Sequence, residues 1–126
     1  TCALPIWSSA VPAVIEKLVE LQQRLAATAD VVMDGRDIGT VVLPDADVKI
    51  YHTASSATRA RRRYLELKEK GEEPDLPKIE QDIIDRDYRD MHREHSPLRQ
   101  AEDAVLLDSS DMTIQEVVER IRELCR

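Results

Sequence analysis

The chain contains no phenylalanine, and aromatic residues make up only 3% of its 126 residues. Aliphatic side chains must therefore supply any core, and a hydrophobic content of 42% is enough for one ordinary domain of this length. No apolar run approaches the roughly 18 residues that a membrane span needs, and no signal-peptide pattern opens the sequence. We therefore expect no membrane association.

The chain also has few cysteines and few glycines, and its net charge is negative. The two cysteines, Cys2 and Cys125, lie at opposite ends without a motif around either, which favours a reducing, cytoplasmic setting. The net charge of −7 argues against general nucleic-acid binding, because affinity for phosphate backbones needs positive potential. The chain also has only three glycines, and no G-x-x-x-x-G-K-[ST] loop occurs in it.

What is present is an alternation of helix and strand patterns. Apolar residues at 3-4-3-4 spacing predict an amphipathic helix from about Pro12 to Ala26, with the stripe Val11, Val14, Leu18, Leu21 and Leu25. Further helices are expected over about 57–70, capped by Ser55 or Ser56 and stopped by Gly71, over about 76–92, and after a capping box at 113–116. That last helix should turn Ile114, Val117, Val118, Ile121 and Leu124 inward. Strands are expected at 31–33, 48–51 and 104–107, so the pattern predicts an α/β fold with a parallel sheet flanked by helices.

The first predicted strand ends at an unusually charged loop, Asp34-Gly35-Arg36-Asp37. In open parallel sheets, ligands bind beyond the carboxyl ends of the strands. An Asp at such a place can hold Mg²⁺, directly or through water, and an Asp beyond an Arg can accept a hydrogen bond from an exocyclic amine. The alternative is a loop with an internal Asp–Arg ion pair, since structural pairs also collect at strand ends.

Arginines form a second pattern. Arg86, Arg89 and Arg93 fall on one helix face, and Arg59, Arg62 and Arg63 crowd another. One explanation is a solvated helix with ion pairs four residues apart, namely Asp82–Arg86, Asp85–Arg89 and Arg86–Asp90. The other is a lid that an anionic ligand orders, since the 76–92 helix has few apolar residues and Arg suits phosphate oxygens.

Other polar residues give less evidence of a functional site. His52, His92 and His95 lack metal-ligand spacing and are expected on the surface. Ser109-Ser110 has no partner histidine in its sequence context, so nucleophilic catalysis is unsupported. The segment 108–112 after the last strand could line an adenine pocket or be a simple turn.

These motifs together resemble one family. Asp34-Gly-Arg-Asp-Ile-Gly-Thr40, Arg59-Ala-Arg-Arg-Arg63, Ile84-Asp-Arg-Asp-Tyr-Arg-Asp90 and Leu106-Leu-Asp108 closely resemble bacterial cytidylate kinase over 8–126. The resemblance implies a P-loop nucleoside-monophosphate kinase that moves the γ-phosphoryl of ATP to CMP or dCMP with Mg²⁺. It also implies a monomer in which residues 71–98 form the lid region.

The resemblance assigns roles residue by residue. It implies a catalytic set of Asp34, Arg36, Arg86 and Arg93, and substrate binding by Arg36, Asp37, Arg86, Asp90 and Arg93, with Asp37 near the cytosine. It implies that Arg59, Arg62, Arg63 and Arg89 approach the ATP phosphates from the lid, and that Asp34 holds Mg²⁺ through water.

The chain departs from the family in two ways. The glycine-rich P-loop is not in these residues, and Ile15 stands where the family usually carries an Arg that contacts CMP. Residues 1–7 are expected to be a non-native leader, because Thr1 to Ile6 match the translation of a common sequencing adaptor. We therefore expect the C-terminal part of a kinase domain, inactive by itself. The alternatives are a kinase for UMP or AMP, or a non-catalytic arginine-rich module that binds RNA or an acidic partner.

Overall fold

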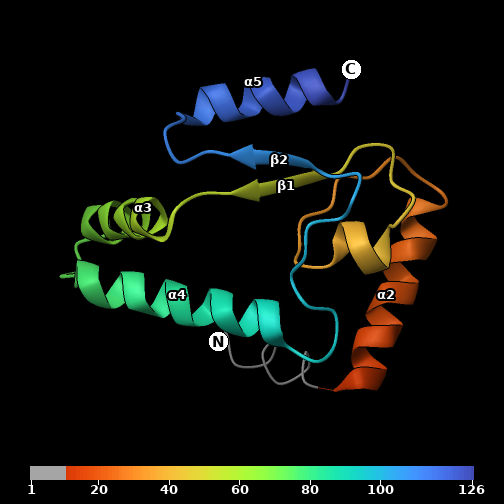
Figure 1. Cartoon of the computed structure of the whole chain (residues 1–126), viewed down its shortest axis with the longest axis horizontal. Helices are drawn as coiled ribbons and strands as arrows, with labels where there is room; N and C mark the ends of the chain where they lie inside the picture. The colour runs from red at the N-terminus through yellow and green to blue at the C-terminus, as the bar shows by residue number, and fades with distance from the viewer. Residues whose placement is uncertain (1–10) are drawn as a thin grey trace.

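The fold is an incomplete α/β arrangement, which confirms the predicted fold class. The structure, a computed structural model, describes residues 11–126, so the expected leader lies outside the described residues. Within them a parallel sheet of two strands is flanked by helices (Figure 1). The elements in chain order are α2 (Pro12–Ala26), the π-helical turn η1 (Ile38–Val42), β1 (Ile50–Thr53), α3 (Ser56–Glu69), α4 (Leu76–His92), β2 (Val105–Asp108) and α5 (Ile114–Leu124).

The sheet pairs β1 with β2 in parallel, from Ile50 opposite Val105 to Thr53 opposite Asp108. Both strands start later than predicted, β1 by two residues and β2 by one. Hydrophobic runs locate a strand, but the ladder of backbone hydrogen bonds fixes its ends. Because the strands are parallel, both carboxyl ends meet at one edge, and the chain continues from that edge into α3 and toward α5 (Figure 1).

The strand predicted at Val31–Met33 is absent from the described part of the chain, and that prediction was wrong. Residues 31–34 carry no regular structure, and no backbone hydrogen bond joins them to another described segment. Val32 is fully exposed, at 103% of its reference area. An apolar run becomes a strand only when a neighbouring strand supplies ladder partners, and these residues have none beside them.

Helices α3 and α4 pack against each other and form a two-helix arm, defined as residues 56–92 (Figure 1). Ser55 caps α3 by accepting a hydrogen bond from the backbone of Thr58, and Asp75 caps α4 in the same way from Lys78. Between them the chain turns at Gly71, whose φ of 81° lies in the left-handed region that glycine tolerates best. The bounds of α4 match the prediction, and those of α3 differ by one residue.

The buried core is small. Among the described residues, the buried apolar side chains are Val42, Ala54, Ala60 and Leu107. Val42 lies in η1, Ala54 directly after β1, Ala60 in α3 and Leu107 in β2.

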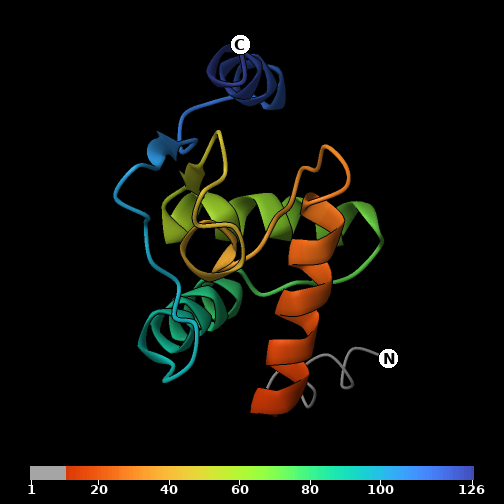
Figure 2. The ribbon, with the colours of Figure 1, turned by 90° about the vertical axis from the view of Figure 1, so that its right-hand side faces the viewer.

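The apolar stripe of α2 is exposed, and that of α5 is covered only in part: Val117, Ile121 and Leu124 are half-buried, whereas the inward orientation predicted for Ile114 and Val118 was wrong. Leu18, Leu21 and Leu25 of α2 remain about half exposed, and in α5 Ile114 is 80% and Val118 50% exposed. Helix α2 instead contacts η1 through its other side, where Gln23 Nε2 donates to the carbonyl oxygen of Val42 at 3.0 Å. Figures 1 and 2 both place α5 beside β2 and away from α4. The spacing predicted the stripes correctly, but not what covers them.

Candidate active site

Two carboxylates on α4 form ion pairs with arginines from three parts of the chain. Asp87 and Asp90 are three residues apart, so they lie on one face of the helix. Asp90 Oδ2 accepts from Arg36 Nε at 3.0 Å and lies 3.9 Å from Arg86 Nε. Asp90 therefore brings together two arginines that the sequence analysis assigned to substrate binding.

Asp87 makes the second contact of this cluster. Its two carboxylate oxygens accept from Nη1 and Nη2 of Arg59 at 3.0 and 2.5 Å, a bidentate pair that joins α3 to α4. Arg59 Nε also donates to the carbonyl oxygen of Ala54 at 2.9 Å. The hydrogen bonds from Arg59, with the charges of Arg59, Arg36 and Arg86, hold the pKa of Asp87 below its usual value. Sequence reasoning missed Asp87, because its partner lies 28 residues away.

The charged loop does not form the internal Asp–Arg pair that was its simpler explanation. Arg36 instead pairs with Asp90, which is 54 residues away. The backbone carbonyl of Asp37 accepts from the backbone N–H groups of Thr40, Val41 and Val42 at 3.3, 2.8 and 3.2 Å. These bonds turn the chain into η1 directly after Asp37 and fix that residue's backbone.

Gly35 and Asp34 complete this loop. A Cβ atom added to Gly35 would lie 2.9 Å from the Ile38 side chain, so a larger residue would displace that side chain. Asp34 is exposed, and no hydrogen bond or ion pair of its carboxylate appears among the described residues.

Arg93 follows the last residue of α4 and turns back on its own segment. Its Nε donates to the carbonyl oxygen of Ser96 at 2.5 Å, and the backbone N–H of Leu98 donates to the carbonyl of Asp90 at 2.8 Å. Ser96 itself adopts a positive φ of 50°. This turn keeps Arg93 and Asp90 close in the chain, but no contact of Arg93 with the Asp90 carboxylate is present among the described residues.

The remaining lid arginines have other partners in this structure. Arg62 Nη2 donates to the carbonyl oxygens of Ser109 and Met112 at 2.5 and 3.3 Å, which ties α3 to the segment before α5. Arg63 pairs with Glu66 at 2.9 Å, and Arg89 Nε donates to the carbonyl of Asp85 at 3.2 Å. Of the pairs predicted within α4, Arg86–Asp90 forms at 3.9 Å, and the described salt bridges include neither Asp82–Arg86 nor Asp85–Arg89.

Ser109 lies at the carboxyl edge of the sheet and is 1% exposed. Its Oγ donates to the carbonyl of Thr53 at 3.1 Å and lies 2.8 Å from Nε2 of His52. The side chain is thus occupied in joining β1 to the chain after β2. His52 is exposed, as expected, but this contact was not predicted.

A second missed contact lies at the opposite end of the strands. Lys49 has only 6% of its side chain exposed, and its Nζ reaches both oxygens of Asp103 at 2.9 and 2.7 Å. This ammonium group lowers the pKa of Asp103. The pair joins the residues that enter β1 and β2, and a partner 54 residues away leaves no signal in local sequence.

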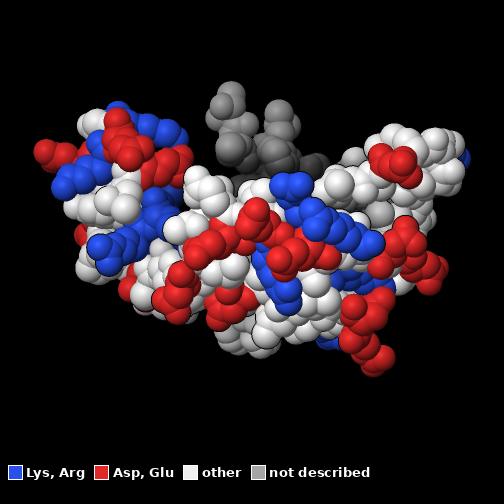
Figure 3. All heavy atoms as spheres, turned by 90° about the horizontal axis from the view of Figure 1, so that it is seen from above, with Lys and Arg blue, Asp and Glu red and all other residues white. Residues whose placement is uncertain are grey.

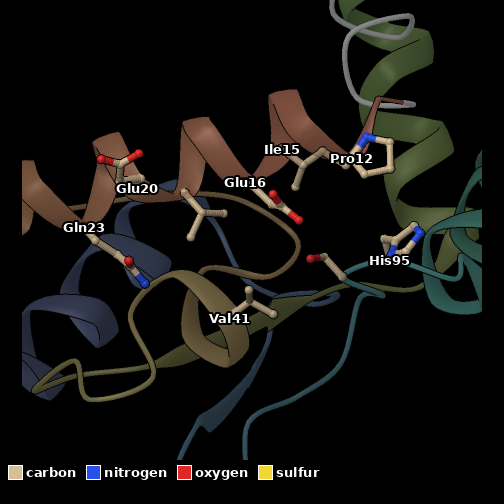
Figure 4. Close-up of a pocket in the computed structure, with 9 residues that line it drawn as sticks. Pro12, Ile15, Glu16, Glu20, Gln23, Val41 and His95 are labelled. Carbon is tan, nitrogen blue, oxygen red and sulfur yellow. The ribbon is translucent and has the colours of Figure 1, made fainter.

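A cavity of about 340 Å³ lies between α2, η1 and the segment after α4 (Figure 4). Ile15 and Glu16 of α2 face it from one side, and Val41 and His95 from the other. Its lining also includes Pro12, Val19, Glu20, Gln23 and Ser96. Ile15, the residue in place of the expected family arginine, thus lines a cavity, but none of the site arginines does.

Charge on the surface is mixed. Figure 3 shows basic and acidic side chains interleaved over the upper face, without a continuous basic patch on that face. No helix among the described residues is long and apolar enough to cross a membrane.

The acidic residues show how a metal ion would have to be held. Residues 11–126 contain no cluster of three or more His, Cys, Asp or Glu side chains able to hold a metal ion. Mg²⁺ commonly takes one or two carboxylates and completes its shell with water and substrate phosphates. The exposed Asp34 carboxylate fits that mode, and a site built only from protein ligands does not fit here.

Parallel strands that lead into a helical arm with paired arginines are consistent with an incomplete α/β fold of the nucleoside-monophosphate kinase type. The chain belongs to the cytidylate kinase family, whose family model matches residues 6–126. It is 57% identical over 116 residues to a cytidylate kinase of Lactobacillus johnsonii, which covers 92% of this chain and 50% of that protein. It is 58% identical over 114 residues to a cytidylate kinase of Streptococcus pneumoniae, covering 90% of this chain and 51% of that one. The chain thus spans about half the length of the curated relatives that it matches.

Proposed function

We propose that the protein of the relatives' full length transfers the γ-phosphoryl group of ATP to CMP or dCMP. The observation that carries the proposal is the Asp90 cluster, in which one carboxylate holds Arg36 and Arg86 together. Arg36 is 42% and Arg86 65% exposed, so both guanidinium groups remain accessible to an anion. The family membership supports the nucleotide as that anion.

The proposed roles follow from the chemistry of phosphoryl transfer. A phosphate oxygen of CMP is itself the nucleophile, so positioning and charge neutralisation are what the protein must supply. Arg36, Arg86 and Arg93 would hold the CMP phosphate and stabilise the charge that spreads over the transferred group. Asp90 would contact the sugar, and Asp37 would accept a hydrogen bond from the cytosine amine.

The lid and the metal complete the proposed site. Arg62, Arg63 and Arg89 would approach the ATP phosphates when the arm closes, which requires each to leave its present partner. Mg²⁺, when bound with ATP, supplies charge neutralisation at the phosphates. Asp34 would hold that ion through water.

We expect the 126-residue chain to be inactive alone, because its sequence contains no phosphate-binding P-loop. The test joins this chain to the part of the Lactobacillus johnsonii cytidylate kinase that it does not span; this is called the joined protein below. Steady-state rates are measured for both proteins with ATP and Mg²⁺ on CMP, dCMP, UMP and AMP.

The joined protein should phosphorylate CMP or dCMP with kcat/KM about a hundredfold above that for UMP or AMP, and the chain alone at least about a thousandfold less efficiently. CMP phosphorylation by the chain alone would refute the second expectation. A preference for UMP or AMP would refute the proposed substrate. The parental Lactobacillus johnsonii protein is the control for assay conditions.

A further inference from the structure

Arg59 makes three hydrogen bonds within the protein. Its Nε donates to Ala54 at the end of β1, and its two terminal nitrogens both donate to Asp87 on α4. Each of the three guanidinium nitrogens therefore has a protein acceptor, which uses three of the five N–H groups. A phosphate ligand could bind this side chain in a bidentate manner only by displacing one of these acceptors.

The contacts of Arg59 span three elements. Arg59 itself lies near the start of α3, and Ala54 lies between β1 and α3. Asp87 lies in the second half of α4. Arg59 is 36% and Asp87 29% exposed, so the pair is partly shielded from solvent. The next helix residue of the same face after Asp87 is Asp90, which holds Arg36 and Arg86.

We infer that Asp87 is a positioning residue: through Arg59 it fixes α4 against the end of β1 and so sets the place of Asp90 and its two arginines. This inference rests on the proposed function for its catalytic consequence. Asp87 and Arg59 do not touch the substrate; they act through α4. A helix that shifts by one ångström would move both arginines relative to a bound phosphate.

The alternative view of Arg59 is a phosphate ligand on the lid, which predicts a different kinetic effect. A ligand of the ATP phosphates would change the KM for ATP or kcat when substituted. A positioning pair near Asp90 would change the KM for CMP. Purely structural damage would lower kcat in proportion to the folded protein lost and leave both KM values unchanged.

The test uses the joined protein with Asp87→Asn and Arg59→Lys. The first removes the carboxylate charge, and the second keeps the positive charge but loses the planar fork. Each should raise the KM for CMP about tenfold, with the KM for ATP changed less than about twofold. Asp87→Glu should bring the KM for CMP back to within about threefold of the unsubstituted protein.

Asp82→Asn is the matched control. It makes the same chemical change on the same helix at an exposed residue that has no ion pair among the described residues. Its KM for CMP should stay within about twofold of the unsubstituted value. If Asp87→Asn prevents folding, Arg59→Lys carries the same comparison, and an unchanged KM for CMP in it would overturn the inference.

Hydrogen exchange separates this inference from the proposed function. Without nucleotide, Asp87→Asn should speed exchange in the second half of α4 about tenfold, while α5 serves as an internal reference that stays unchanged. Unchanged exchange in α4 would overturn the inference. Faster exchange in a joined protein that does not phosphorylate CMP would instead overturn the proposed function. It would still support the positioning role of the Arg59–Asp87 pair.

Discussion

The two-helix arm and the sheet side of the molecule, here β1, β2 and α5, differ in how much of their apolar surface is covered. The arm is joined internally by the Arg59–Asp87 pair, by Ser56 Oγ donating to Glu80 at 3.2 Å, and by the fully buried Ala60. On the sheet side, Leu106 is 56% and Ile114 80% exposed. Helices with strong apolar stripes gain most of their stability from a partner surface. Helices α3 and α4 cover part of each other within this chain, whereas Leu106 and Ile114 remain largely uncovered.

That difference agrees with the length comparison. The relatives are about twice as long as the chain, so the structure contains the arm with its internal contacts and a sheet side that meets little else. It also agrees with the small buried core. An ion pair or a helix cap needs only two groups, as in Arg59–Asp87, but a core needs several packed layers.

The largest expected effect compares two leucines of similar exposure. In the joined protein, Leu106→Ala on β2 should lower the free energy of unfolding by about 2–5 kcal/mol, because the added polypeptide buries the sheet side. Leu65→Ala on α3 should cost less than about 1 kcal/mol, because the outer face of the arm stays exposed. In the chain itself they are 56% and 51% exposed. Urea unfolding measures both, and equal costs would contradict the comparison between arm and sheet side.

A smaller effect follows from the depressed pKa of Asp87. Its ordinary value is 3.8, and Arg59 lowers it in the folded state. The stabilisation is therefore fully present above pH 3.8 and is lost as the pH falls through the lower folded-state value. Asp87→Asn should cost about 1.5 kcal/mol at pH 6 and progressively less toward pH 2.

Urea unfolding of the joined protein with and without the substitution, across this pH range, measures that difference. Asp82→Asn, on the same helix, is the reference for the loss of one carboxylate. A difference between Asp87→Asn and the unsubstituted protein that stays constant down to pH 2 would exclude the charged pair as its source.

The smallest effect concerns the turn of the arm. Gly71→Ala should lower the free energy of unfolding by about 1 kcal/mol, since φ is 81° there and a Cβ disfavours that conformation, although it would meet no atom within 4 Å. Gly39→Ala is the matched control: its added Cβ would lie at van der Waals distance from Lys49, 3.4 Å from Cδ. Thermal unfolding of both variants tests the pair, and an equal loss would show that the backbone angle is not the cause.

Local patterns predicted the helices well. The bounds of α2 and α4 agree with the structure, Ser55 caps α3, and Thr113 with Glu116 forms the predicted capping box. These features depend on residues within one or two turns, so the sequence contains all the information that they need. The strand predicted at 31–33 and the burial predicted for Ile114 and Val118 of α5 were wrong for the opposite reason, because each requires a partner segment.

The candidate site divides in the same way. The charged loop and the arginines on α4 were recognised by residue type and spacing, but their pairing was not. Asp90 pairs with Arg36, which is 54 residues away in the sequence, and Asp87 pairs with Arg59, which is 28 residues away. The assignments of Asp34, Arg36, Asp37, Arg86 and Arg93 to substrate, metal and catalysis stay predictions.

The sequence by itself determined the family, the helices and their caps, because motif spacing and capping depend on near neighbours along the chain. The tertiary structure decided which carboxylate each arginine meets and which apolar faces are covered. Those contacts join residues far apart in the sequence, and they exist only once α3, α4 and the strand ends have packed together.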